Sequence, residues 1–172
     1  MADLAEPVHD GDHIRGPADA ELVLVMYGDF ECPYCLAAQG ILDRVRARLG
    51  DELRFVFRHF PLDGVHPLAR QAAELSEAAA AQDAFWPAHD ALFAAQGRLQ
   101  GAGLVKIARD LGLDAARVEQ ELRDGTHAAR VQHDVDTGTA SGVTGTPGFF
   151  ANGVMVQGAF DAGSLVAALR GQ

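Results

Sequence analysis

The only two cysteines of the 172-residue chain, Cys32 and Cys35, lie in the segment DFECPYC at 29–35. Such a pair is redox-active, supplies half of a zinc site, or arises by chance. An apolar run ends just before Cys32 and a helical pattern begins near Cys35, so the pair is predicted at a helix N-terminus. Free backbone N–H groups and the helix dipole favour a thiolate there. This position favours the redox interpretation.

Each residue of the CPYC segment fits that chemistry. Pro33 suits the first helical turn, where a missing N–H costs no hydrogen bond, and the i, i+3 spacing brings both sulfurs within disulfide range. We predict an exposed Cys32 of low pKa that attacks a disulfide, and a more shielded Cys35 that resolves the mixed disulfide. The catalytic group would then be the Cys32–Cys35 disulfide, with no further cofactor.

No metal site is expected from the sequence. A structural zinc site needs four ligands, and the chain has no second CxxC. His127 and His133 are six positions apart and would point to different faces of a helix. His9 and His13 lie in a polar N-terminal segment that looks loosely structured.

The pattern around the cysteines predicts a strand, a helix and a second strand. ELVLVMYGDF (21–30) and LRFVFRHF (53–60) are apolar runs typical of strands buried on both faces. The helix between them would end at Gly50, and Gly40 within it indicates a kink or close packing. Its apolar face would consist of Cys35, Ala38, Leu42, Val45 and Leu49.

The rest of the chain is predicted to be helical up to about residue 141 and then to return to strands. Strands at 147–151 and 154–157 would form a hairpin through the Asn-Gly turn between them. A last helix would follow Asp161 or Ser164. The resulting division is a lead-in segment (1–20), a core (21–65 and 142–172) and an all-helical insertion (66–141).

Two motifs, DFECPYC (29–35) and GVTGTPGFFANG (142–153), resemble the DsbA-like branch of the thioredoxin superfamily. The resemblance implies an α/β thioredoxin fold (βαβ…ββα) with a central mixed sheet and a helical insertion. It also implies a thiol–disulfide oxidoreductase that acts on protein or peptide thiols and disulfides. Glutathione and a thioredoxin-type reductant are candidate redox partners.

The same resemblance assigns the substrate side of the site. Thr146-Pro147 matches the cis-proline loop, in which the backbone of Thr146 would pair with an extended substrate strand. Tyr34, placed between the cysteines at an exposed turn, is predicted to contact substrate. Phe30 and Val143 are predicted to line an apolar groove.

One position departs from the family pattern. Relatives carry a buried carboxylate six residues before the first cysteine, thought to move protons for the resolving thiol, and this chain has Met26 there. Asp29 and Glu31 are closer to the helix start and are expected to be solvated. His59 and Glu52 are further candidates for the missing proton carrier.

Composition restricts the partners. The chain has 24 acidic and 14 basic side chains, a net charge of -10, so a nucleic-acid partner is not expected. No apolar run reaches the roughly 18 residues of a membrane span, and the N-terminus lacks a signal-peptide pattern, which predicts a cytoplasmic protein. Domains of this sequence type also occur fused to ion antiporters, so the alternative is a non-enzymatic redox-sensing or peptide-binding module.

Overall fold

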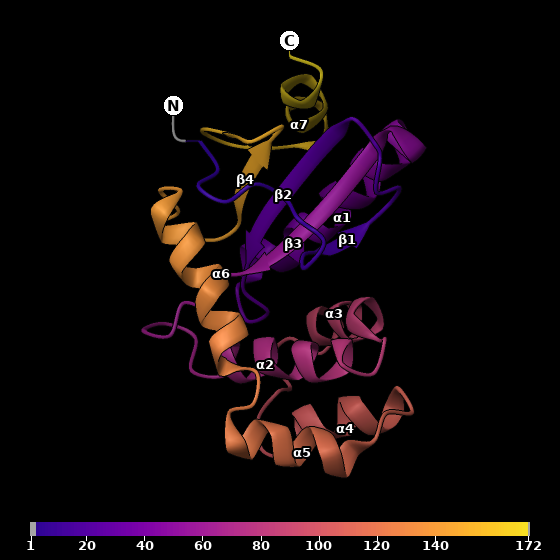
Figure 1. Cartoon of the computed structure of the whole chain (residues 1–172), viewed down its shortest axis with the longest axis vertical. Coiled ribbons are helices and arrows are strands. Elements are labelled where there is room, and N and C mark those ends of the chain that lie inside the picture. The colour runs from indigo at the N-terminus through magenta and orange to yellow at the C-terminus, as the bar shows by residue number, and fades with distance from the viewer. Residues whose placement is uncertain (1–2, 172) are drawn as a thin grey trace.

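The computed structural model describes residues 3–171, and within them five strands form one mixed sheet in the order β1-β3-β2-β4-β5 (Figure 1). Strands β2 and β3 are parallel, and the other neighbours are antiparallel. The predicted α/β class is therefore confirmed. The strands are β1 (His13–Arg15), β2 (Leu22–Gly28), β3 (Leu53–His59), β4 (Gly148–Ala151) and β5 (Val154–Met155).

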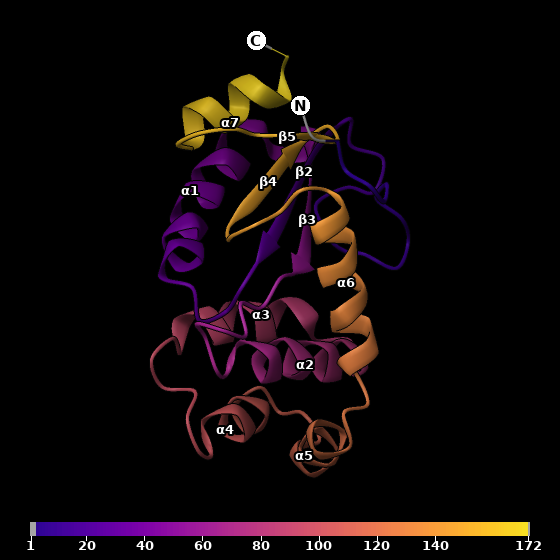
Figure 2. The ribbon, with the colours of Figure 1, turned by 90° about the vertical axis from the view of Figure 1, so that its left-hand side faces the viewer.

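Helices cover both faces of the sheet and one of its ends. Figure 2 shows α1 and α7 on one face, α6 along the other, and α2 to α5 beyond the end of the sheet. Among residues 3–171, none of the helices combines the length and the apolar character needed to cross a membrane. The helices are α1 (Pro33–Leu49), α2 (Ala69–Ala80), α3 (Phe85–Ala94), α4 (Gly103–Asp110), α5 (Ala115–Asp124), α6 (Ala128–Ala140) and α7 (Ala162–Leu169), with a 3-10 turn at Gly50–Glu52.

The topology places the cysteines at the end of the sheet that faces the helices α2 and α3. Because β2 and β3 are parallel, the segments that follow Gly28 and His59 leave the sheet at the same edge. Helix α1 starts from this edge and packs along the sheet through the apolar face expected from the sequence. Alternate residues of β2 face opposite sides: Met26 lies in the core beneath α1, and Tyr27 lies in the core beneath α6.

The lead-in segment is more ordered than the sequence suggested. His13–Arg15 forms strand β1 and pairs antiparallel with β3, at the edge of the sheet. Three residues are too few to show a readable strand pattern, which explains why the prediction missed this strand. Residues 1–2 of the predicted lead-in and residue 172 of the predicted core lie outside the described residues.

Two local expectations need correction. Strand β5 ends at Met155, two residues earlier than predicted, although Asn152 and Gly153 both have the positive φ of a tight hairpin turn. Gly40 is exposed, and a Cβ built there would have only the tip of Arg44 within 4 Å, at 4.0 Å. Close packing is therefore not the reason for this glycine.

Candidate active site

Cys32 is the N-cap residue of α1, and Pro33 occupies the first helical position. The extended backbone of Cys32 (φ −71°, ψ 119°) turns its side chain toward the first turn of the helix, where N–H groups lack intrahelical acceptors. Cys35 follows one turn later on the buried face of α1. The structure thus places the pair at the helix start that the sequence predicted.

Both cysteines are free thiols and both are buried. Cys32 is 2% exposed and Cys35 is fully covered. The prediction of an exposed Cys32 is therefore wrong, because the loop that carries Thr146 lies against its sulfur. The Cys32 thiol donates to the Thr146 carbonyl oxygen at 3.5 Å.

The two thiols have opposite pKa shifts. The pKa of Cys32 is lowered to about 5, mainly by the hydrogen bond from Cys35. Burial of the sulfur acts in the opposite direction and raises this pKa. Hydrogen bonds from Thr146 and from the backbone N–H groups of Cys35 and Tyr34 lower it further. Burial raises the pKa of Cys35, and the neighbouring Cys32 charge raises it further. Cys32 is thus the thiolate of the pair at neutral pH, and Cys35 remains a thiol.

The loop between α6 and β4 brings Thr146 to the cysteines. The Thr146–Pro147 peptide bond is cis, and the Thr146 carbonyl faces Cys32. The Thr146 hydroxyl oxygen is buried and has no hydrogen-bond partner among residues 3–171. Once Cys32 ionises, this hydroxyl can donate to the thiolate, in agreement with its lowering effect on the Cys32 pKa.

The predicted substrate contacts separate into three cases. Tyr34 is 73% exposed beside the cysteines and is free to touch another molecule. Val143 and Pro147 line a pocket of about 240 Å³ next to the cis loop. Phe30 does not fit its predicted role: it is buried and packs on Phe57 and Phe93 as part of the core.

Met26 is fully buried in the same core cluster as both cysteines, so this side of the pair is apolar. Its backbone neighbours in the sheet are Phe57 and Phe149. The structure thus puts a methionine where the family pattern has a carboxylate, with aromatic residues on the adjacent strands.

Of the two acids expected to be solvated, Glu31 is half-buried and accepts a hydrogen bond from Leu68 N at 2.6 Å, and Asp29 is buried. The Asp29 carboxylate accepts hydrogen bonds from Glu31 N at 2.7 Å, Leu62 N at 2.9 Å and His66 Nδ1 at 2.7 Å. Its backbone carbonyl accepts from Cys32 N at 3.1 Å. Asp29 therefore fixes the turn before α1. The sequence did not single out His66, since nothing local indicates that residues 29 and 66 meet.

Neither of the other candidate proton carriers is bonded to the cysteines. His59 is fully buried, and its Nε2 lies 2.7 Å from Glu77 Oε1. Burial disfavours the Glu77 carboxylate, but hydrogen bonds from His13 and His59 outweigh it and hold the pKa of Glu77 below its usual range. Glu52 precedes β3, at the opposite end of the strand from His59, and its carboxylate pairs with Arg170 at 3.0 Å.

The arrangement contains the parts needed for thiol–disulfide exchange. A thiolate at Cys32 is a nucleophile and a good leaving group, and a neighbouring thiol can displace it. The cis loop leaves a backbone carbonyl and a hydroxyl beside the reacting sulfur. On the Met26 side, the surroundings of Cys35 within residues 3–171 are apolar and offer no proton carrier.

Sequence comparison places the chain among known proteins. The family model described as DSBA-like thioredoxin domain matches residues 23–170. The chain is 47% identical over 172 residues to the Na(+)/H(+) antiporter NhaA 1 of Salinispora arenicola, covering 98% of the chain and 26% of that protein. It is 44% identical to an antiporter of the same name from Mycolicibacterium vanbaalenii, covering 96% and 27%. The chain thus spans about a quarter of these relatives.

Comparison with solved structures shows the same architecture. BdbD from Bacillus subtilis, in its oxidised form, superposes with a TM-score of 0.87 at 22% identity, covering 99% of this chain and 97% of that one. At this identity, the likeness concerns the fold alone. It extends over the helices α2 to α6 as well as over the sheet.

Proposed function

The chain belongs to the DSBA-like thioredoxin domain family, and from this premise we propose that it is a thiol–disulfide oxidoreductase acting on protein or peptide thiols. The predicted family and the thioredoxin fold with a helical insertion are confirmed. The observation that supports the activity is the Cys32 thiolate, with a pKa of about 5, at the start of α1 and facing Thr146.

The lowered Cys32 pKa supports the oxidising direction. A stable thiolate favours the reduced form of the protein, which makes its disulfide a stronger oxidant. A substrate thiolate attacks the Cys32 sulfur and breaks the Cys32–Cys35 bond, and Cys35 leaves and takes up a proton. A second substrate thiolate then attacks the substrate sulfur of the mixed disulfide and releases Cys32 as a thiolate. The substrate loses two electrons and the protein gains them.

The reaction in the reverse direction uses the same atoms. The Cys32 thiolate attacks a substrate disulfide, and Cys35 displaces the substrate from the mixed disulfide. In both directions Thr146 would hold an extended substrate segment by backbone pairing, and Tyr34 and Val143 would contact its side chains. Glutathione and a thioredoxin-type reductant stay predicted redox partners, and the cytoplasmic location stays a prediction.

The reduction potential of the pair tests the direction. Equilibration against glutathione buffers should give a value nearer to about −120 mV than to about −270 mV if the protein is an oxidant. In a turnover assay, oxidation of a dithiol peptide should require both Cys32 and Cys35. When the disulfide form of the peptide is supplied instead, Cys35→Ser should accumulate the mixed disulfide, because Cys32 attacks the substrate disulfide and no second thiol displaces it. Full turnover by Cys32→Ser would refute the proposed enzyme.

The second candidate is a redox-sensing domain that does not turn over. It is favoured by the names of the curated relatives, which are Na(+)/H(+) antiporters about four times as long as this chain. A sensor would be reduced once per chain and would not oxidise excess dithiol peptide, even with an added oxidant. Many turnovers per chain would decide for the enzyme.

A further inference from the structure

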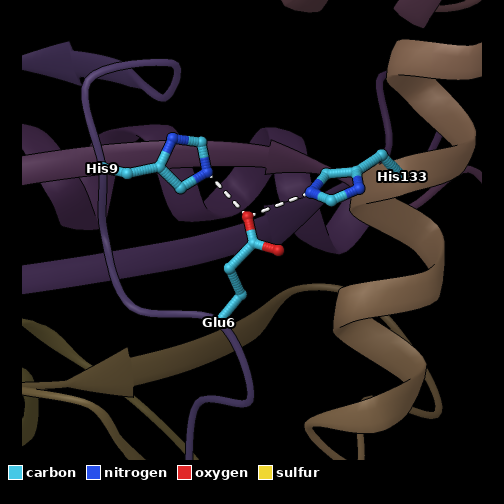
Figure 3. Close-up of side chains that lie close together, drawn as sticks. All are labelled: Glu6, His9 and His133. Carbon is cyan, nitrogen blue, oxygen red and sulfur yellow. Dashed lines mark hydrogen bonds and ion pairs between the residues drawn. The ribbon is translucent and has the colours of Figure 1, made fainter.

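Outside the cysteine site, two histidines and a glutamate from distant segments meet on the surface (Figure 3). Glu6 Oε1 lies 2.7 Å from His9 Nε2 and 3.0 Å from His133 Nε2. The three ligand atoms all lie within 4.8 Å of one another. In sequence, His133 is 127 positions from Glu6, and only the packing of the lead-in segment beside α6 brings them together.

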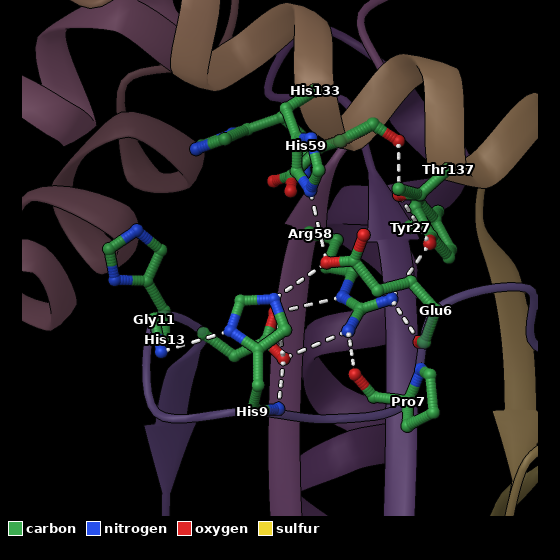
Figure 4. Close-up of polar contacts among 12 residues, drawn as sticks. Glu6, Pro7, His9, Gly11, His13, Tyr27, Arg58, His59, His133 and Thr137 are labelled. Carbon is green, nitrogen blue, oxygen red and sulfur yellow. Dashed lines mark hydrogen bonds and ion pairs between the residues drawn. The ribbon is translucent and has the colours of Figure 1, made fainter.

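The backbone that carries two of these side chains is held in place by buried groups (Figure 4). Arg58 donates to the carbonyl oxygens of Glu6 at 2.9 Å and Pro7 at 3.2 Å. Asp12 accepts from His9 N at 3.0 Å and from Arg58 at 2.8 Å. Both Arg58 and Asp12 are buried. The positions of Glu6 and His9 are thus fixed by the fold, and their side chains remain adjustable.

We propose that Glu6, His9 and His133 bind one divalent first-row transition-metal ion, for which zinc is the probe. Two imidazole nitrogens and one carboxylate oxygen are a donor set that such ions accept, with water in the remaining position. A net charge of -10 favours cations near the surface. Nothing in the proposed redox function calls for this site.

The distances allow an ion after small side-chain movements. Bonds of about 2.0–2.2 Å in a tetrahedral site put ligand atoms roughly 3.3–3.6 Å apart, against 2.7 and 3.0 Å in the structure. The side chains of His9, Glu6 and His133 are 45%, 29% and 51% exposed, so they can separate by the required distance, under about 1 Å, without disturbing the core.

The ion would replace the two hydrogen bonds between the histidines and Glu6, and one further hydrogen bond must be given up. Gly11 N donates to His9 Nδ1 at 3.0 Å, whereas binding a metal through Nε2 places the ring proton on Nδ1. The Gly11 N–H would then turn to water, which is available because Gly11 and His9 are exposed. The lost hydrogen bond lies in an exposed turn, and the buried hydrogen bonds of Arg58 and Asp12 stay in place.

A second cluster, formed by His13, His59 and Glu77, has the same residue types and fits an ion less well. Its N···O distances are 2.6 and 2.7 Å, and its members are packed in the interior, with His13 stacked on Phe85 at 3.5 Å. A metal bound to His59 Nε2 would leave the ring proton on Nδ1. Within residues 3–171, this buried nitrogen has no hydrogen-bond partner that could accept the proton. The ion is therefore assigned to the surface cluster.

The site is tested by zinc binding in a variant with Cys32→Ser and Cys35→Ser, because two free thiols would bind zinc themselves. Equilibrium dialysis after chelator treatment should give one saturable zinc ion per chain. In this background, His9→Gln and His133→Gln should each weaken binding by at least about tenfold, since even the loss of an outer-shell partner costs about 10- to 100-fold. Glu6→Gln should act in the same direction.

Two matched controls separate this site from other histidines. His127→Gln removes a histidine that precedes α6, and His13→Gln disrupts the interior cluster. Both should leave zinc affinity unchanged, and circular dichroism should show that every variant is folded. The proposal is overturned if His9→Gln and His133→Gln bind as the parent does, if binding is absent or not saturable, or if His13→Gln alone loses the ion.

Discussion

The ionisation of Cys32 depends on donors that two distant segments, the first turn of α1 and the loop before β4, direct at one sulfur. Cys35 comes from the first turn of α1, the backbone N–H groups from the helix start, and Thr146 from the loop before β4. Burial of the sulfur opposes them. Changes at single residues should therefore shift the Cys32 pKa in directions that can be worked out in advance.

Alkylation of the reduced protein by iodoacetamide should follow the Cys32 thiolate. The folded pKa is about 5, below the ordinary cysteine value of about 8.5, so the thiolate fraction rises as the pH rises through 5 and is constant above about 7. The labelling rate should show that profile, and mass spectrometry should find the label on Cys32. Labelling that rises only above about pH 8, or that occurs first on Cys35, would contradict the site geometry.

Thr146→Val should raise the pKa of Cys32. The substitution keeps the β-branched shape and removes the hydroxyl that lowers this pKa, so the midpoint of the alkylation profile should move to higher pH. Thr144→Val, two residues earlier and exposed, is the matched control and should leave the midpoint in place. An unchanged midpoint in Thr146→Val would show that the hydroxyl does not stabilise the thiolate.

Met26→Glu should also raise the Cys32 pKa, because a carboxylate behind the cysteines stabilises thiols over thiolates. It should speed release of the mixed disulfide by supplying Cys35 with a proton carrier. An ionised carboxylate at this fully buried position costs several kcal/mol, so urea unfolding should show a less stable protein. Met26→Gln is the neutral control. If Met26→Glu and Met26→Gln release the mixed disulfide at the same rate and have the same Cys32 pKa, another group already carries the proton.

At the scale of single helices, two glycines within helices, one exposed and one buried, should respond to alanine with opposite signs. A Cβ at Gly40 in α1 would meet only the tip of Arg44, at 4.0 Å, so Gly40→Ala should stabilise the protein by roughly 0.5–1 kcal/mol. Gly138 in α6 lies against the rings of Phe60 and Tyr27, where a Cβ would sit 2.8 and 2.9 Å from ring carbons. Gly138→Ala should therefore destabilise it by about 1–3 kcal/mol.

Urea unfolding of the two alanine variants beside the parent measures both effects. The pair controls for helix propensity, because the same atom is added to a helix in each case. A destabilised Gly40→Ala would indicate that α1 needs the glycine for a reason that its contacts do not show. A neutral Gly138→Ala would mean that α6 can move away from the sheet.

At the scale of the whole molecule, Arg58 joins the lead-in segment to the sheet. It lies on β3, is buried, and donates to Asp12, Tyr27 and the carbonyls of Glu6 and Pro7. Its removal leaves the buried Asp12 charge without a partner, which costs about 3–5 kcal/mol in comparable cases. Arg58→Met should lower the free energy of unfolding by that amount, and Arg58→Met with Asp12→Leu should recover much of it.

The pH dependence of the Arg58–Asp12 pair gives a second readout. Burial alone would raise the pKa of Asp12, but hydrogen bonds from Arg58 and the His9 backbone hold it below its usual value. The contribution to stability is therefore complete above an unfolded pKa of about 3.9 and is lost as the pH falls toward the folded value. Acid unfolding of the double variant should lack this component, and an identical acid transition would exclude the pair as its source.

Local patterns in the sequence were enough to place the cysteines at a helix start, the buried face of α1, and the Asn152-Gly153 hairpin. These features depend on neighbours one to four residues apart, through backbone hydrogen bonds, side-chain periodicity and the φ angles that glycine permits. The two family motifs then placed Thr146-Pro147 beside the cysteines, although 114 positions separate Thr146 from Cys32.

Tertiary packing decided what each side chain near the site touches. It buried Cys32 and Phe30, paired Asp29 with His66, added His13–Arg15 to the sheet, and joined Glu6 and His9 to His133. A polar residue in a turn looks solvated when only its neighbours in sequence are known. Whether it is buried depends on which distant segment covers it, and that follows from the packing of apolar faces, which contact side chains across the whole chain at once.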